Sequence, residues 1–497
     1  MSDSLNRRAA SAAKWSIVTE TLVKVVSPVT QLILARILAP EAFGMVATVT
    51  MVTSFADMFS DSGFQKYLVQ HEFKSERVLY RSANVAFWTN MAVSLVMWAG
   101  IALLRDPLAV FVGSPGLGFP IAVACASLPL TSFSSIQLAL FRRRLDFKTI
   151  MPVRVAVALV PLVVTVPFAL AGMGFWSLII GTIAGNVINA VALTALSPWK
   201  PRLFYSFALL RDMFAFSGWS LLEAIAIWAT SWAGTFVVGN LLDSYHLGLY
   251  RQPMTFVNSA FNLVTNATTP VLFASLSRLQ DSDEEFRSFF YRFQFSVAMF
   301  VLPLGVGIFC FRDFLTDLLL GDQWGDAALM MGCWGLSTGV MIVFSHYCSE
   351  VFRSKGRPKV SLICQILYMC VMVPTLYVSA SVGFEQLVIA NAAVRLAGIA
   401  INQTAMYLVS GISFRAVLSG VGAPLVSSCV MGCVGLVAAE WAGKSWTLCA
   451  VGILLCVLVY AASCMAFRSS RRFLMGLLRG RGMFGNQESR CSGPIEK

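Results

Sequence analysis

The segment LARILAPEAFG, residues 34–44, joins two long apolar runs and sets the pattern for the rest of the chain. Proline and glycine in this segment mark a short turn between the runs. A helix of about 20 apolar residues spans a hydrocarbon core about 30 Å thick. Fourteen runs of that length occur, at roughly 15–38, 43–64, 82–104, 117–140, 150–170, 173–197, 213–239, 246–275, 289–311, 327–350, 358–380, 384–408, 419–440 and 446–467. We therefore predict an all-α polytopic membrane protein with about 14 transmembrane helices.

The composition of the 497 residues supports this fold class. The chain is 57% hydrophobic and 12% charged, and its mean hydropathy is +0.73. Soluble proteins carry about 25% charged residues, so this chain has too little polar surface to cover a water-soluble particle. The composition excludes a cytosolic enzyme, a disordered chain and a nucleic-acid-binding domain, and we expect no nucleic-acid partner.

The lysines and arginines indicate how the helices are oriented. With the N-terminus in the cytoplasm, 29 of the 37 basic residues fall in cytoplasmic segments, 4 in outer segments and 4 inside spans. Short cytoplasmic loops of membrane proteins carry such an excess. Residues 1–14 do not resemble a cleaved signal peptide, because their small residues precede the apolar stretch instead of following it. We predict that both termini are cytoplasmic, and most of the net charge of +12 reflects orientation.

The cysteines and histidines do not predict a metal site. The twelve cysteines lie mostly in or beside apolar runs, with no CxxC or Cys/His spacing, and the three histidines are far apart. We interpret the cysteines as small apolar side chains within helices. No metal, no cofactor and no catalytic residue is therefore predicted.

The chain contains an internal repeat. A shift of 204 residues places Trp15-Ser16 on Trp219-Ser220, Leu38 on Leu242 and Gly44 on Gly248. Six spans per unit is an even number, so both units enter the membrane from the same side, and in such transporters the substrate site lies between the halves. We predict two pseudo-symmetric six-helix lobes around a central cavity, plus two extra C-terminal helices. The predicted parts are a cytoplasmic N-terminus (1–14), an N-terminal lobe (15–197), a linker (198–212), a C-terminal lobe (213–408), two further spans (419–467) and a basic cytoplasmic tail (468–497).

The residues around the first turn resemble a known family. Trp15, the segment 34–44, Asp61-Ser62-Gly63-Phe64 and Leu68-Val69-Gln70 are similar to the opening of the bacterial polysaccharide flippases. These belong to the multidrug/oligosaccharidyl-lipid/polysaccharide exporter superfamily. In the second half Gly248-Leu249-Tyr250 and the segment 269–280 agree with the family, whereas Asp243-Ser244 replace the Ala39-Pro40 of the first half.

The resemblance carries expectations about function. It implies alternating-access transport of undecaprenyl-diphosphate-linked oligosaccharide repeat units across the bacterial inner membrane, for exopolysaccharide, capsule or O-antigen synthesis. It further implies membrane lipids as surroundings and a polysaccharide polymerase and glycosyltransferases as neighbours. The composition and the repeat do not themselves identify the substrate.

Basic residues inside or at the ends of the spans are candidates for binding a diphosphate. A charge in a span costs from about 2.5 kcal/mol upward unless it faces a cavity or a partner. Arginine offers bidentate contacts to phosphate, and lysine offers a point charge. The candidates are Lys24, Arg36, Arg251 and Arg395. Lys24 could instead form a structural ion pair with Glu20, one helical turn away, and Arg36 could simply lie at the outer interface. Arg154, close to the cytoplasmic end of its span, is expected to extend to the interface.

Acidic residues in the spans are candidates for coupling transport to an H⁺ or Na⁺ gradient, because intramembrane carboxylates often serve as relays. These are Glu20, Asp57 and Glu223, while Asp61 could be only a helix-end cap. The chain has no GxxxxGK[ST] motif, so ATP hydrolysis of that kind is not expected.

Three alternatives remain open from the sequence. A drug or peptidoglycan-precursor exporter of the same superfamily would share the fold and differ in substrate. An integral-membrane polysaccharide polymerase or ligase would need a sizeable outer loop with catalytic residues, and the outer loops here are short. A scaffold protein would not need charges at mid-depth.

Overall fold

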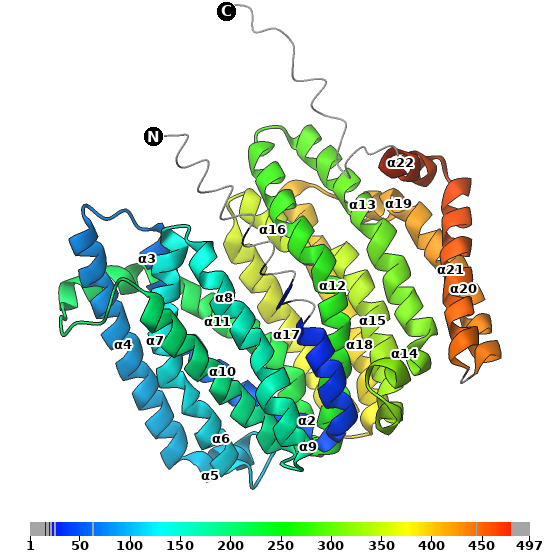
Figure 1. Ribbon diagram of the computed structural model, residues 1–497. Coiled ribbons are helices and arrows are strands. Elements are labelled where there is room, and N and C mark those ends of the chain that lie inside the picture. The colour runs from blue at the N-terminus through cyan, green and yellow to red at the C-terminus, as the bar shows by residue number, and fades with distance from the viewer. Residues whose placement is uncertain are drawn as a thin grey trace, which may run out of the picture. The chain divides into compact units, whose positions relative to one another are not determined.

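The computed structural model describes residues 15, 19, 22–23, 26–61, 64–443 and 445–478, and throughout these ranges the regular secondary structure is helical (Figure 1). The first described helix covers Val26–Ile37. The later helices are α2 (Pro40–Asp61), α3 (Phe64–Gln70), α4 (Glu76–Leu103), α5 (Arg105–Phe111), α6 (Gly118–Cys125), α7 (Ser127–Arg143), α8 (Phe147–Val160), α9 (Val166–Leu170), α10 (Phe175–Leu196), α11 (Phe207–Leu241), α12 (Ser244–Arg278), α13 (Asp283–Cys310), α14 (Arg312–Leu319), α15 (Ala328–Met341), α16 (Cys348–Ser354), α17 (Pro358–Ala380), α18 (Phe384–Ser410), α19 (Phe414–Gly420), α20 (Gly422–Ala442), α21 (Trp446–Ala466) and α22 (Arg468–Leu478).

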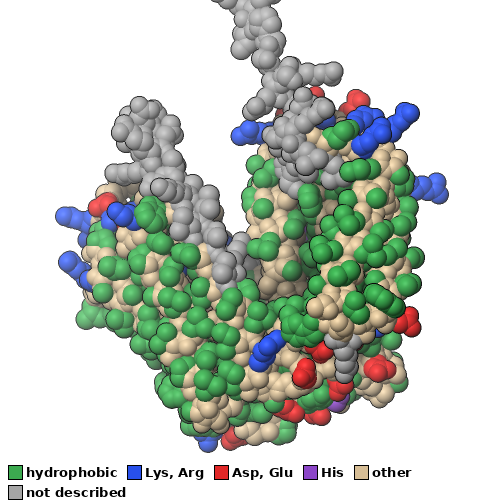
Figure 2. Space-filling model, turned by 45° about the vertical axis from the view of Figure 1, so that its right-hand side comes forward, with side chains coloured by type: hydrophobic (Ala, Val, Ile, Leu, Met, Phe, Trp, Pro, Cys, Tyr) green, Lys and Arg blue, Asp and Glu red, His purple; other side chains and the backbone are tan. Residues whose placement is uncertain are grey.

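The predicted all-α membrane fold is confirmed. Twelve helical segments of the described chain are long and apolar enough to span a membrane, and each corresponds to one predicted run. Of the two other predicted runs, 246–275 lies on α12, and the described part of 15–38 contains the helix Val26–Ile37. Val26–Ile37 is shorter within the described residues, and α12 contains more polar residues than the other spans. On the face seen in Figure 2, hydrophobic side chains predominate, and Lys and Arg side chains lie mainly near the upper margins of the view.

The helices group into two compact units, Met1–Arg251 and Gln252–Lys497. This grouping rests on packing and places α11 and the first two turns of α12 with the first unit. The lobes predicted from the repeat divide the chain at 198–212 instead. The predicted lobes follow the internal repeat and not the packing of the helices, and they stay a prediction.

In the first unit, two helices are capped at their N-termini by polar side chains. The Ser75 hydroxyl accepts a hydrogen bond from the Val78 amide at the start of α4. The Asp146 carboxylate accepts bonds from the Thr149 amide and hydroxyl at the start of α8. Such caps satisfy amide groups that have no partner within the helix. A buried cluster on α3, α4 and α7, including Phe64, Leu68 and Phe87, holds these helices together.

The second unit contains large buried side chains on α13 and directly before α16. Phe286, Phe290, Phe293 and Tyr347 are at most 2% exposed, and the Phe293 and Tyr347 rings meet edge to face, 5.1 Å between centroids. The Tyr347 hydroxyl and that of Thr268 on α12 are hydrogen-bonded at 2.7 Å. Aromatic pairs of this kind add to the free energy gained by burial, so α12, α13 and α16 are firmly connected within this unit.

Within the described residues, two π-helical turns interrupt spans. They are η1 (Pro161–Thr165), which separates α8 from α9, and η3 (Ile342–His346), which separates α15 from α16. The side-chain amides of Gln294 and Gln403 donate hydrogen bonds to the carbonyl oxygens of Val343 and Phe344, which lie in η3. Carbonyl groups that a π turn releases from the helical pattern are thus satisfied by buried glutamines. Turns of this type occur frequently at functional sites.

The starts of α2 and α12 cross at two glycines in the first unit. A Cβ atom added to Gly44 would lie 1.8 Å from the carbonyl oxygen of Ser244. A Cβ atom added to Gly248 would lie 2.0 Å from the carbonyl oxygen of Pro40. Only glycine permits backbones to approach this closely. The crossing therefore requires glycine on both helices.

Candidate functional site

Arg251 occupies an aromatic setting in the first unit. Its guanidinium carbon lies 4.1 Å from the centroid of the Trp232 ring, a cation–π contact between α12 and α11. Arg251 and Trp232 are both half-buried. An arginine held over an indole ring keeps its charge while losing part of its water shell. Arg251 is thus a partly desolvated cation with a fixed orientation.

Further polar and aromatic groups of the first unit lie on α2, α7 and α11. The Trp228 indole nitrogen donates a hydrogen bond to the Ser54 hydroxyl at 3.0 Å, and the Trp228 and Phe55 ring centroids are 4.7 Å apart. Asp57, one turn further along α2, accepts a hydrogen bond from the Thr131 hydroxyl at 3.3 Å. The half-buried Asp57 carboxylate is therefore held by α7.

Arg395 is the corresponding cation of the second unit. Its guanidinium carbon lies 3.4 Å from the centroid of the Trp334 ring, and Nη1 donates to the hydroxyls of Ser337 and Thr338 at 3.2 and 2.7 Å. The Trp334 indole nitrogen in turn donates to Asn258 Oδ1 at 3.0 Å. Three residues of α15 therefore hold the Arg395 guanidinium, through one ring face and two neutral hydroxyls, and Asn258 on α12 accepts a hydrogen bond from that ring.

The other predicted site residues are distributed differently. Arg36 is exposed near the end of the helix Val26–Ile37. Lys24 and Glu20 lie outside the described residues, and so does the side chain of Glu223 on α11. Arg251 and Arg395 belong to different compact units, and the prediction that they line one cavity stays a prediction. Among the described residues, no group of three or more His, Cys, Asp and Glu side chains is placed to hold a metal.

Reasoning from the sequence did not include Trp232 and Trp334 among the site residues. Each is spaced irregularly from its arginine in the chain, so no motif links them. The available signal was compositional, since a cation inside a span needs a partner and tryptophan is the best aromatic partner. Cation and ring are brought together by helix packing, which the sequence pattern does not give.

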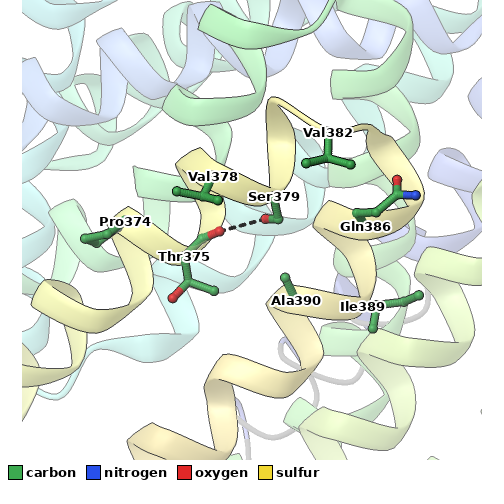
Figure 3. A pocket seen from close by; sticks show the side chains of 8 residues that line it. All are labelled: Pro374, Thr375, Val378, Ser379, Val382, Gln386, Ile389 and Ala390. Carbon is green, nitrogen blue, oxygen red and sulfur yellow. Dashed lines mark hydrogen bonds between the residues drawn. The ribbon is translucent and has the colours of Figure 1, made fainter.

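Three cavities each lie within a single unit. One, of about 680 Å³, opens between the ends of α17 and α18, and its lining is mostly apolar (Figure 3). The Ser379 hydroxyl in this cavity donates to the Thr375 carbonyl oxygen at 2.8 Å. Another, of about 460 Å³, lies in the first unit and is lined by Arg154. A third, of about 110 Å³, also lies in the first unit and is lined by Arg144 and Asp146 among other residues. Charged side chains therefore line the second and third cavities.

The chain matches known proteins over most of its length. Residues 33–329 match the family described as polysaccharide biosynthesis protein. The succinoglycan biosynthesis transport protein ExoT of Rhizobium meliloti (strain 1021) is 28% identical over 336 residues, which is 67% of each chain. The lipopolysaccharide biosynthesis protein WzxC of Escherichia coli (strain K12) is 21% identical over 388 residues, covering 76% of this chain and 77% of that protein.

Solved structures share the fold. The lipid II flippase MurJ, in an inward closed conformation, superposes with a TM-score of 0.72 at 11% identity, covering 92% of this chain and 98% of that one. An inward-facing multidrug resistance MATE transporter of the MOP superfamily gives a TM-score of 0.56 at 14% identity, with 80% of this chain and 99% of that one covered. At these identities the likeness concerns the fold. Since the family match covers more than half of its residues, this chain belongs to the polysaccharide biosynthesis protein family of membrane proteins.

Proposed function

We propose that the protein is a flippase, which moves lipid-linked oligosaccharide repeat units across a bacterial inner membrane for polysaccharide synthesis. The observation that carries this proposal is the family match over residues 33–329, together with 28% identity to a protein named for succinoglycan transport. The fold supports it, because all described spans are helices suited to a polytopic transporter. The short loops between the described spans favour transport over polymerase or ligase chemistry, so we do not assign an enzymatic activity.

The substrate of this proposal is an oligosaccharide attached to undecaprenyl diphosphate. A diphosphate carries two or more negative charges and needs cationic donors when it leaves water. Arg251 and Arg395 suit this role, since each guanidinium is positioned over a tryptophan ring and Arg395 is further held by two hydroxyls. Lys24 and Arg36 complete the proposed set.

The proposed orientation places both termini in the cytoplasm of a cell with an inner membrane. Its support is the distribution of basic residues, 29 in the predicted cytoplasmic segments against 4 in the outer ones. A polysaccharide polymerase and the glycosyltransferases that assemble the repeat unit would be neighbours in the same pathway.

Movement against a gradient of substrate needs a source of energy, and we propose an H⁺ or Na⁺ gradient. Asp57 is the best supported coupling residue, because its half-buried carboxylate accepts a bond from Thr131 and could exchange a cation. Glu20 and Glu223 are further candidates. In vesicles with an imposed gradient, Asp57→Asn should abolish the stimulation of transport by the gradient. Unchanged stimulation would remove Asp57 from this role.

A deletion strain tests the proposed function. Without the protein, complete lipid-linked repeat units should accumulate in the cytoplasmic leaflet while polymer disappears. A strain that accumulates lipid II instead would identify a peptidoglycan-precursor exporter. Normal polymer with no accumulated lipid-linked intermediate would contradict the proposal.

A further inference from the structure

A cavity of about 460 Å³ in the first unit combines one cation with amide and hydroxyl groups. It lies between the helix Val26–Ile37, α7, α8 and α10. Its polar lining consists of Ser27, Thr30, Gln31, Arg154 and Asn189, and the other lining residues include Val153, Val157, Ala158 and Leu193. The cavity therefore has a polar part and a hydrocarbon part.

The helix that carries Arg154 is firmly anchored. Val153 and Ile150 on α8 and Leu193 on α10 are each at most 4% exposed and belong to one buried cluster. The Arg154 side chain, next to buried Val153, is exposed on the cavity side of α8. The cluster thus fixes the backbone that presents the guanidinium.

A π turn forms the far end of the cavity. Pro161, the first residue of η1, is one of the lining residues. The turn is pressed against α10, because a Cβ atom on Gly181 would lie 1.8 Å from the Thr165 hydroxyl oxygen. A π turn widens a helix locally. Here it separates α8 from the helices that follow without breaking the span.

In the proposed orientation, Arg154 lies in the cytoplasmic half of its span. Arg154 is seven residues beyond Phe147, the start of α8, which is about 10 Å along the helix axis. The basic residues Arg142, Arg143 and Arg144 precede this helix and lie on the cytoplasmic side in the proposed orientation. In that orientation, a long arginine side chain on this turn can extend toward the headgroup region of the cytoplasmic leaflet.

We propose that this cavity binds the phosphate-bearing headgroup of a lipid in the cytoplasmic leaflet, with Arg154 as the principal anion-binding residue. The guanidinium can contact two phosphate oxygens at once, and the amides of Gln31 and Asn189 supply further donors. The apolar lining accommodates the first carbons of the lipid chain. If the lipid is the lipid-linked diphosphate, the cavity binds the transport substrate before it is moved. This assignment rests on the proposed function. A glycerophospholipid offers the same chemistry.

Native mass spectrometry of the purified full-length protein distinguishes the two lipid sources. One arm adds undecaprenyl diphosphate and the other adds phosphatidylglycerol, and each measures the apparent dissociation constant. Arg154→Ala should weaken binding about 10-fold or more in one arm or both. Arg154→Lys should weaken it less, because lysine keeps the charge and loses the bidentate contact.

Two further variants separate binding in the cavity from general effects of charge. Ala158→Phe fills the cavity without altering charge and should weaken binding as Arg154→Ala does. Arg278→Ala removes an exposed arginine at the end of α12 and should leave binding unchanged. Binding by Arg154→Ala equal to that of the unmodified protein in both arms would overturn the proposal, and so would equal losses in Arg154→Ala and Arg278→Ala.

Failure of this inference can be told apart from failure of the proposed function. The binding assay does not require transport. Arg154-dependent binding in a protein that moves no lipid-linked oligosaccharide would keep the cavity and remove the flippase assignment. Normal transport by a protein whose lipid binding is independent of Arg154 would keep the flippase assignment and remove the binding site.

Discussion

Gly44 and Gly248 lie 204 residues apart in the chain, and each packs against the start of the helix that carries the other. A side chain at either position would collide with the backbone of that helix. Gly44 faces the Ser244 carbonyl and Gly248 faces the Pro40 carbonyl. The same shift of 204 residues that superposes the two glycines also superposes Pro40 and Ser244. The contact is therefore reciprocal, as in a two-fold symmetric interface. The contact supports the register of the repeat with evidence from helix packing, in addition to the identical residues.

The glycine crossing predicts that Gly44→Ala and Gly248→Ala each destabilise the protein. An added methyl group must push apart two backbones, and overpacking of this kind costs about 1–3 kcal/mol. The double variant should cost less than the sum, because the first methyl group already separates the helices. Thermal unfolding in detergent, followed by circular dichroism, measures each difference.

Gly100→Ala is the matched control for this prediction. Gly100 lies within α4, and a Cβ atom there would have no neighbour within 4 Å. Alanine favours a helix over glycine by about 1 kcal/mol, so this variant should be as stable as the unmodified protein or more so. Equal effects of alanine at positions 44 and 100 would contradict the close crossing.

The turn before α12 predicts a dependence of stability on pH. Burial raises the pKa of Asp243, but hydrogen bonds from the His246 backbone and ring and the charge of that ring outweigh it, and the pKa is lowered. A lowered pKa in the folded state stabilises the protein above the ordinary value of 3.8, and this stability is lost as pH falls through the lowered pKa. Asp243→Asn should be less stable than the unmodified protein at neutral pH.

Unfolding measured in urea at a series of pH values checks this expectation. The difference in stability between Asp243→Asn and the unmodified protein should shrink as the pH falls below 3.8. A difference that is constant between neutral pH and pH 3 would show that the carboxylate charge does not contribute.

The setting of Arg395 predicts that lysine cannot replace it. Lysine keeps the charge but cannot stack a planar group on Trp334 while donating to Ser337 and Thr338. Arg395→Lys should lower the rate of polysaccharide export about 10-fold at normal protein level, and Arg395→Ala should lower it further. Surface polysaccharide per cell and membrane content by immunoblot are the two measurements. Arg278→Ala is the control for loss of an arginine outside the site, and a rate for Arg395→Lys equal to that of the control would argue against a precise role for the guanidinium.

Trp232 should act through Arg251 rather than through its own contact with substrate. If so, Trp232→Phe, which keeps an aromatic face, should export more than Trp232→Leu, which removes it. In an Arg251→Ala background the two tryptophan variants should no longer differ. A double-mutant cycle on export rate gives the coupling between the residues. Independent effects of the two sites would contradict the cation–π assignment.

The sequence predicted the fold class well because its signal is carried by whole segments. Each predicted run is long enough that errors of a few residues at its ends do not alter the assignment. The α12 segment shows the limit of this reasoning: it forms a 35-residue helix although its polar residues, among them Arg251 and Asn258, lower its hydropathy. The π turns at 161–165 and 342–346 could not be predicted, because they depend on packing and not on local composition.

The candidate site could be predicted only in part. Arg395 and Arg251 were identifiable because a charge in a span is unusual. Their partners Trp334 and Trp232 were not identifiable, since each ring comes from another helix and its position depends on tertiary packing. Arg154 was not predicted to be a site residue, because its position near a helix end suggests only contact with the membrane interface. In the structure it lines a cavity together with four other polar residues.

A transport assay in reconstituted vesicles tests the central claim most directly. Purified protein is placed in liposomes containing a fluorescent undecaprenyl-diphosphate oligosaccharide, and an impermeant reductant quenches the label in the outer leaflet. The account predicts that quenching proceeds beyond half in vesicles with the unmodified protein and stops near half with Arg395→Ala. Quenching that stops near half with both proteins, at equal reconstitution, would contradict the assignment as a lipid-linked oligosaccharide flippase.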